Sequence, residues 1–128
     1  GANCGIGPAE LLHSVSGILS TSVNMPVVAK GNCGIPEYAE GTIRYHGTPE
    51  LMAKYALFAR DMGAKIIGGC CGTSPAHVAA MVAALNATPV RDFDEGAMIN
   101  VIGEAWSDID IDNAIRNGRR TRRKRRRQ

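Results

Sequence analysis

The same order of segments occurs three times along this chain: a short apolar stretch, a glycine-rich loop, and a helix that starts at a proline. The three helix starts pair a cap residue with proline at the first helical position, at Gly7-Pro8, Thr48-Pro49 and Ser74-Pro75. The apolar spacing after them predicts helices over residues 8–23, 48–62 and 75–85. Strands are predicted just before the loops, at residues 1–4, 26–30 and 65–68. Repeated strand–loop–helix units of this kind build an α/β fold with parallel strands and right-handed crossovers.

Two α/β architectures accommodate such units, a doubly wound sheet and a (βα)8 barrel. All three loops that follow the strands carry unusual chemistry, and barrels gather their functional residues at the carboxyl ends of the strands, which favours the barrel. The segment 31–47 is rich in glycine, contains Pro36 and is predicted to be a long loop. The third helix is predicted to bury a stripe of Val78, Met81, Val82 and Leu85.

Two adjacent cysteines, Cys70 and Cys71, lie in the sequence Gly-Gly-Cys-Cys-Gly-Thr-Ser-Pro at residues 68–75. Adjacent Cα atoms are about 3.8 Å apart, which is shorter than a disulfide usually spans. Glycines on both sides give the backbone the freedom to turn both thiols to one side, so the pair suits a metal site better than a disulfide. A third thiol is needed, and Cys4 is the candidate.

The predicted sheet brings these cysteines together. Cys4 ends one strand and Cys70 ends the strand two along, so the two strand ends are about 10 Å apart and their side chains can converge on one ion. The strand between them ends in Asn32-Cys33. Asn32 would be a weak, displaceable oxygen ligand, whereas Cys33 would close a four-thiolate structural site. The simplest interpretation of Cys33 is a free, partly buried thiol.

Composition fits one small domain of 128 residues with 45% hydrophobic content. The sequence has no run of roughly 20 apolar residues, so no membrane association is predicted. Four cysteines without a visible secretory signal favour a reducing, cytoplasmic location. The chain starts at Gly1, inside a motif and without an initiator methionine, so we expect a fragment of a longer protein.

The basic charge is concentrated at the end of the chain. Residues 118–128 hold eight basic residues, which leaves seven basic and twelve acidic residues in the remainder. Such a block is predicted to be disordered and solvated, and nucleic-acid binding is the less favoured alternative. Residues 88–117 are predicted to be an acidic extension that docks on the barrel or on a second subunit. Among the histidines, His13 is predicted to be partly buried and His77 solvated, and only His46 is placed near the site.

Four motifs together resemble a known family. They are Gly-Ala-Asn-Cys-Gly-Ile-Gly-Pro (1–8), Ala-Lys-Gly-Asn-Cys-Gly-Ile-Pro (29–36), Thr-Pro-Glu-Leu-Met-Ala (48–53) and Gly-Gly-Cys-Cys-Gly-Thr-Ser-Pro (68–75). In order and spacing they are similar to the zinc-dependent homocysteine methyltransferases, which include betaine–homocysteine methyltransferase and the homocysteine domain of cobalamin-dependent methionine synthase. The resemblance implies that residues 1–87 are the last three units of a (βα)8 TIM barrel. By position, it makes Cys4, Cys70 and Cys71 the zinc ligands.

The resemblance also implies an activity, methyl transfer to the thiol of homocysteine to give methionine, with no catalytic residue beyond the metal site. Asn32 matches the family pattern and would be the displaceable ligand, whereas Cys33 stands at an alanine position. Gly72 after the cysteine pair favours the betaine and cobalamin branches over relatives that use S-methylmethionine. The extension with its polybasic end then favours betaine as the methyl donor over cobalamin. A non-catalytic four-cysteine zinc module remains an alternative. The expected partners are homocysteine and a methyl donor, and a homo-oligomer is left open. The fragment is expected to be inactive by itself.

Overall fold

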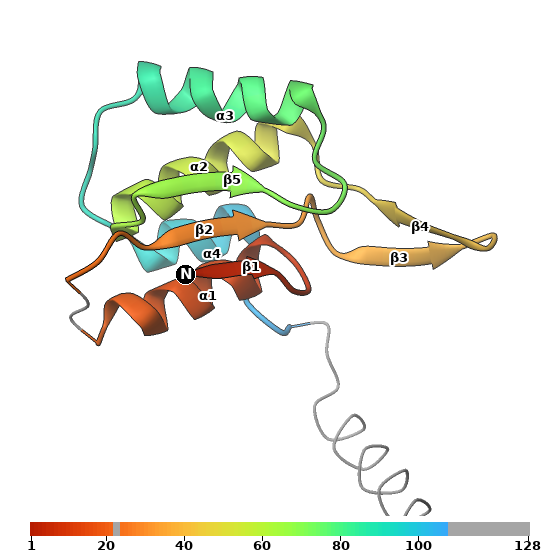
Figure 1. The fold of residues 1–128 in the computed structure, drawn as a ribbon, viewed down its shortest axis with the longest axis horizontal. Coiled ribbons are helices and arrows are strands. Elements are labelled where there is room, and N and C mark those ends of the chain that lie inside the picture. Colours follow the sequence, from red (N-terminus) through yellow and green to blue (C-terminus); the bar gives the residue numbers. More distant parts are fainter. Residues whose placement is uncertain (22–23, 108–128) are drawn as a thin grey trace, which may run out of the picture.

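Three parallel strands form the central sheet. The structure, a computed structural model, describes residues 1–21 and 24–107. The strands are β1 (Ala2–Cys4), β2 (Val28–Gly31) and β5 (Ile66–Gly69), in the order β1-β2-β5. Cys4 is in register with Gly31, and Gly31 with Gly69, so the three carboxyl ends lie side by side (Figure 1). The predicted strands and their parallel order are confirmed.

One helix follows each strand of this sheet. The crossover helices are α1 (Pro8–Leu19), between β1 and β2, and α2 (Pro49–Met62), between β2 and β5, and α3 (Pro75–Ala87) follows β5. Each begins at the predicted proline, and the Thr48 hydroxyl caps α2 by accepting a hydrogen bond from the Leu51 backbone N–H. The prediction that the first helix runs to residue 23 was wrong. The Ser20 and Thr21 hydroxyls donate to backbone carbonyls of the last turn and so compete with continued helix.

One face of the sheet packs against the helices. Ala29 is fully buried in a core that includes Leu12, Val15 and Tyr55, whereas Lys30, on the opposite face, is exposed. The helix stripe predicted for residues 75–85 is only half buried. Met81 is in the core, but Val78 and Val82 are 46% and 51% exposed, because α3 packs on α2 and β5 with one side only.

The predicted long loop at residues 31–47 is instead an antiparallel hairpin of β3 (Pro36–Ala39) and β4 (Thr42–Tyr45). Its turn residues, Glu40 and Gly41, both have positive φ, at 51° and 82°. This is the backbone sign that two-residue hairpin turns require, and it turns the chain back on itself. The hairpin projects beyond the carboxyl ends of the sheet strands (Figure 1).

A fourth helix, α4 (Glu95–Ile102), lies in the segment that was predicted as an acidic extension. Asp94 caps it by accepting a hydrogen bond from Ala97 N, and Met98 is buried. The helix packs against α2 and α1, so this part of the extension docks on the crossover helices. The predicted polybasic tail, residues 118–128, lies outside the described residues. Within the described part, no helix is long and apolar enough to cross a membrane.

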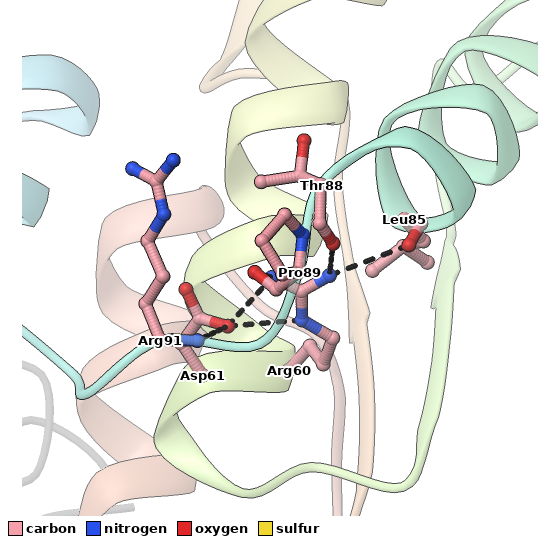
Figure 2. A network of polar contacts seen from close by, with 6 residues as sticks. All are labelled: Arg60, Asp61, Leu85, Thr88, Pro89 and Arg91. Atoms are coloured by element: carbon pink, nitrogen blue, oxygen red, sulfur yellow. Dashed lines mark hydrogen bonds and ion pairs between the residues drawn. The ribbon is translucent and has the colours of Figure 1, made fainter.

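A polar network around Arg60 holds the end of α3 and the following chain against α2 (Figure 2). The Arg60 guanidinium donates to the backbone carbonyls of Leu85, Thr88 and Pro89 and forms an ion pair of 2.7 Å with Asp61. Asp61 in turn accepts a hydrogen bond from Arg91 N. Both side chains of the ion pair are largely buried, at 15% and 11% exposure. The network therefore satisfies carbonyls that the helix end leaves unpaired.

Arg60→Leu is expected to destabilise the fold by about 3 kcal/mol, because the buried Asp61 carboxylate loses its cationic partner and keeps the hydrogen bond from Arg91 N, while several carbonyls lose their donor. The control is Arg44→Leu, which breaks an ion pair with Glu40 whose side chains are 55% and 83% exposed and should cost less than about 1 kcal/mol. Chemical denaturation of both variants measures the difference. Equal losses would show that the Arg60 network adds no more than a surface ion pair.

Candidate metal centre

Three cysteine sulfurs converge at the carboxyl ends of the strands. The Sγ atoms of Cys4, Cys70 and Cys71 all lie within 4.8 Å of one another. The Cys4–Cys71 and Cys70–Cys71 sulfur pairs are each 3.9 Å apart, and all three thiols are free. Cys4 comes from the end of β1, and the other two follow β5.

The backbone is bent sharply on both sides of the cluster. Cys4 has φ of 66°, and Gly5 after it has φ of 84°. Left-handed backbone is unfavourable for a residue with a Cβ, and such strain gathers at functional sites. On the other side, Gly72 has φ of 77°, and a Cβ there would lie 2.5 Å from the Tyr45 Cβ. Tyr45, from β4, thus packs directly on the glycine that follows the cysteine pair.

The sulfurs influence one another's ionisation. Hydrogen bonds from Cys71 and then Cys70 hold the pKa of Cys4 below its usual value. Loss of solvation raises the pKa of Cys70, and its hydrogen bonds to the other two thiols raise it further. The pKa of the Tyr45 phenol is raised, first by hydrogen bonding with the Cys71 side chain. The pKa values of Cys4 and Cys70 thus move in opposite directions within one cluster.

The sulfur spacing fits a tetrahedral metal ion. With metal–sulfur bonds of about 2.3 Å, the sulfurs of a tetrahedral zinc site are about 3.8 Å apart. Two of the observed separations are 3.9 Å. Three free thiols, two pairs of which already have this spacing, therefore suit a divalent ion such as zinc. Cys71 is exposed, so the cluster is open to solvent at this residue.

Comparisons with known proteins identify the family of this chain. The family model described as homocysteine S-methyltransferase matches residues 1–85. The chain belongs to this family. The match contains all three cysteines of the cluster and ends within α3.

Among curated relatives of this homocysteine S-methyltransferase family chain are two proteins named methionine synthase. The one from Mycobacterium tuberculosis (strain ATCC 25618 / H37Rv) is 36% identical over 86 residues, and the one from Mycobacterium leprae (strain TN) is 35% identical over the same length. Each match covers 66% of this chain and 7% of the relative. The chain therefore matches a small part of these longer proteins.

Two loops carry the cluster, and we call them the cysteine loops: one follows β1 at Cys4, and the other follows β5 and contains Cys70 and Cys71. Asn32, the residue after β2, lies between them and is 1% exposed. Its Nδ2 donates to the Gly5 carbonyl at 2.8 Å, and its Oδ1 accepts from the Cys71 backbone N–H at 3.1 Å. Both ends of the carboxamide are thus in use in this structure. One lone pair of Oδ1 remains for a further partner.

Cys33, the next residue, does not join the thiol cluster. It is fully buried, and its Sγ donates to the Gly47 carbonyl at 2.9 Å. Burial raises the pKa of its thiol, so it stays protonated. The sequence predicted a free thiol here, and the structure confirms that, with deeper burial than expected.

The expectations for His77 and His13 were wrong. His77 was predicted to be solvated, but its Nδ1 accepts from Ser74 N and its Nε2 lies 3.1 Å from the Gly47 carbonyl. It thereby connects the start of α3 to Gly47, whose carbonyl also accepts the hydrogen bond from Cys33. His46 pairs with Glu37 on the hairpin and is 62% exposed, and His13 is exposed and meets Trp106 edge to face. The capping position of His77, three residues after Ser74, was the signal in the sequence that could have identified it.

Proposed function

We propose that Cys4, Cys70 and Cys71 hold a zinc ion in a protein that transfers a methyl group to the thiol of homocysteine, giving methionine, with betaine as the donor. The observation that carries this proposal is the convergence of three sulfurs within 4.8 Å from two separate strand ends. When bound there, zinc would keep a coordinated substrate thiol deprotonated near neutral pH. Such an ion needs one open position for the substrate, and the cluster supplies three ligands on an exposed side.

The chain's own residues would hold the metal ion and orient the substrate. The three cysteines would hold the ion in one geometry, and the exposed side near Cys71 would admit a thiol substrate. The homocysteine sulfur would then form its bond to the donor methyl carbon as the carbon–nitrogen bond breaks, and the electron pair would leave with the nitrogen. No further side chain of the described residues is assigned a proton-transfer role.

We further propose that the described sheet is part of a (βα)8 barrel, in which the face carrying Lys30 points to the barrel interior. Support comes from the exposure of Lys30 and Ile66 on one face and the burial of Ala29 on the other. Three units cannot close a barrel, so the chain alone is expected to be inactive. The free thiols suit a reducing cytoplasmic compartment.

Two alternatives differ from this proposal in donor or in chemistry. A cobalamin-bound methyl group is the alternative donor, and the two mycobacterial relatives are named methionine synthase, a name that gives the product and not the donor. A closed four-cysteine zinc module would need Cys33, whose sulfur is instead bonded to the Gly47 carbonyl. The enzyme proposal therefore has better support than the structural module.

The test uses the complete protein with cobalt(II) in place of zinc. Adding homocysteine should change the thiolate-to-cobalt absorption bands, whereas homoserine, with a hydroxyl in place of the thiol, should not. Methionine formation is then assayed with betaine and, separately, with methylcobalamin. An unchanged spectrum with homocysteine would contradict the proposal that homocysteine is the substrate. Turnover with methylcobalamin and none with betaine would contradict the proposal that betaine is the donor.

A further inference from the structure

We propose that Asn32 is a positioning residue whose carboxamide links the two cysteine loops and sets the separation of their sulfurs. The proposal concerns the arrangement of the loops, and its effect on metal affinity rests on the function proposed above. Asn32 is almost completely buried, so its polar groups must find partners inside the protein. Its two partners belong to the two loops that carry the thiols.

The side chain extends the sheet by one step beyond the strands. The last paired rung joins Cys4, Gly31 and Gly69, after which β1 and β5 end. One residue later, Asn32 donates to the Gly5 carbonyl on one side and accepts from Cys71 N on the other. A carboxamide has one donor side and one acceptor side, as a peptide group has, and can therefore replace a missing rung in both directions.

The two connections made by Asn32 are not equally supported by other bonds. The loop after β5 is also held to β2 by backbone bonds, from Cys70 N to the Gly31 carbonyl at 2.8 Å and from Cys33 N to the Cys71 carbonyl at 2.9 Å. The Cys4 loop is reached by the 2.8 Å bond from Asn32 to Gly5. Gly5 and Cys4 both have left-handed backbone, so this bond holds a strained segment in place. Its loss should release Cys4 more than Cys71.

The positioning role can be separated from a role as metal ligand by one substitution. Asn32→Asp keeps an acceptor for Cys71 N but removes the donor to Gly5 and places a carboxylate against that carbonyl. A carboxylate is a better ligand for a divalent ion than an amide oxygen. A ligand role therefore predicts equal or tighter metal binding in Asn32→Asp, whereas the positioning role predicts weaker binding.

The experiment compares Asn32→Asp and Asn32→Ala with Asn86→Ala, an exposed asparagine on α3, in the complete protein. Zinc affinity is measured by competition with a chelator, and hydrogen exchange of the Cys71 amide is measured in the metal-free protein. We expect both Asn32 variants to bind zinc about 10- to 100-fold more weakly, the range for residues that orient metal ligands. The Cys71 amide should exchange faster in Asn32→Ala but stay protected in Asn32→Asp, and Asn86→Ala should change neither quantity.

The two readouts separate the possible failures. Unchanged Cys71 exchange in Asn32→Ala, or zinc binding by Asn32→Asp as tight as in the parent, would overturn the positioning role. If the parent binds no zinc, the proposed function fails, and the exchange of the Cys71 amide still decides whether Asn32 holds the loop. If Asn32→Ala does not fold, Asn32→Asp, which has the same shape, supplies the affinity result by itself.

Discussion

Cys4→Ala, Cys70→Ala and Cys71→Ala are each expected to lose zinc and methyl transfer, with zinc affinity reduced by more than about 100-fold. Two thiolates that remain after any one substitution cannot complete a site of three protein ligands. The effect should be similar for all three, because each supplies one sulfur of a cluster within 4.8 Å. Metal content of the purified variants and methionine formation by the complete protein measure the two losses.

The matched control is Cys33→Ala, which removes a thiol one residue from Asn32 without touching the cluster. It breaks the hydrogen bond to the Gly47 carbonyl and is expected to cost about 1 kcal/mol of stability. Zinc content should stay at the parent value. Full zinc in any of the three cluster variants, or loss of zinc in Cys33→Ala, would refute the ligand assignment.

Gly72→Ala is expected to reduce stability by about 3 kcal/mol or more and to weaken zinc binding. An alanine at this position would have to adopt φ of 77°, and its Cβ would lie 2.5 Å from the Cβ of Tyr45. A left-handed conformation costs an alanine about 1–2 kcal/mol, and the close contact adds a packing penalty of about 1–3 kcal/mol. Either Tyr45 or the loop that carries Cys71 must then shift, and a shift of that loop moves a ligand.

A second glycine isolates the two contributions. Gly41 in the hairpin turn has φ of 82°, but a Cβ there would have nothing within 4 Å. Gly41→Ala should therefore show the conformational cost alone and leave zinc affinity unchanged. Denaturation midpoints and chelator competition measure both variants. Equal losses of stability would mean that Tyr45 moves freely and does not fix the cysteine loop.

The arrangement of the cysteines was predictable because parallel strands end at one edge of a sheet. The proline-started helices at Pro8, Pro49 and Pro75 determined the order of strands and helices, and that order placed Cys4 and Cys70 at the ends of two strands that flank β2. The residue type then limited the chemistry, since adjacent cysteines make poor disulfides. No knowledge of side-chain contacts was needed for this step.

The hairpin and α4 were not predicted, for local reasons. Glu40-Gly41 is a weaker turn signal than asparagine or aspartate before glycine, and the short strands carry exposed polar residues. Helix α4 has only eight residues, and its identity depends on the Asp94 cap and on burial of Met98 against other helices. The helices that Met98 packs against lie far away in the sequence, so the local residues alone do not show this contact.

The hydrogen bonds of Asn32 and His77 were not predicted because their partners lie on other elements. Asn32 bonds to Gly5 and Cys71, which are 27 and 39 residues away. His77 lies near the Gly47 carbonyl, 30 residues away. A polar residue near a site can ligate, orient or cap, and only the three-dimensional partner distinguishes these roles.

The long sequence separation within the thiol cluster has a consequence for folding. Cys4 and Cys71 are 67 residues apart, and β2 lies between their strands. Contacts between distant residues form slowly, because a long loop must close before they contribute stability. During synthesis, Cys4 emerges before the other two cysteines. It can join them only after β2, both crossover helices and β5 have been made. The cluster therefore assembles only after the last strand has paired, and its formation reports that the described sheet is complete.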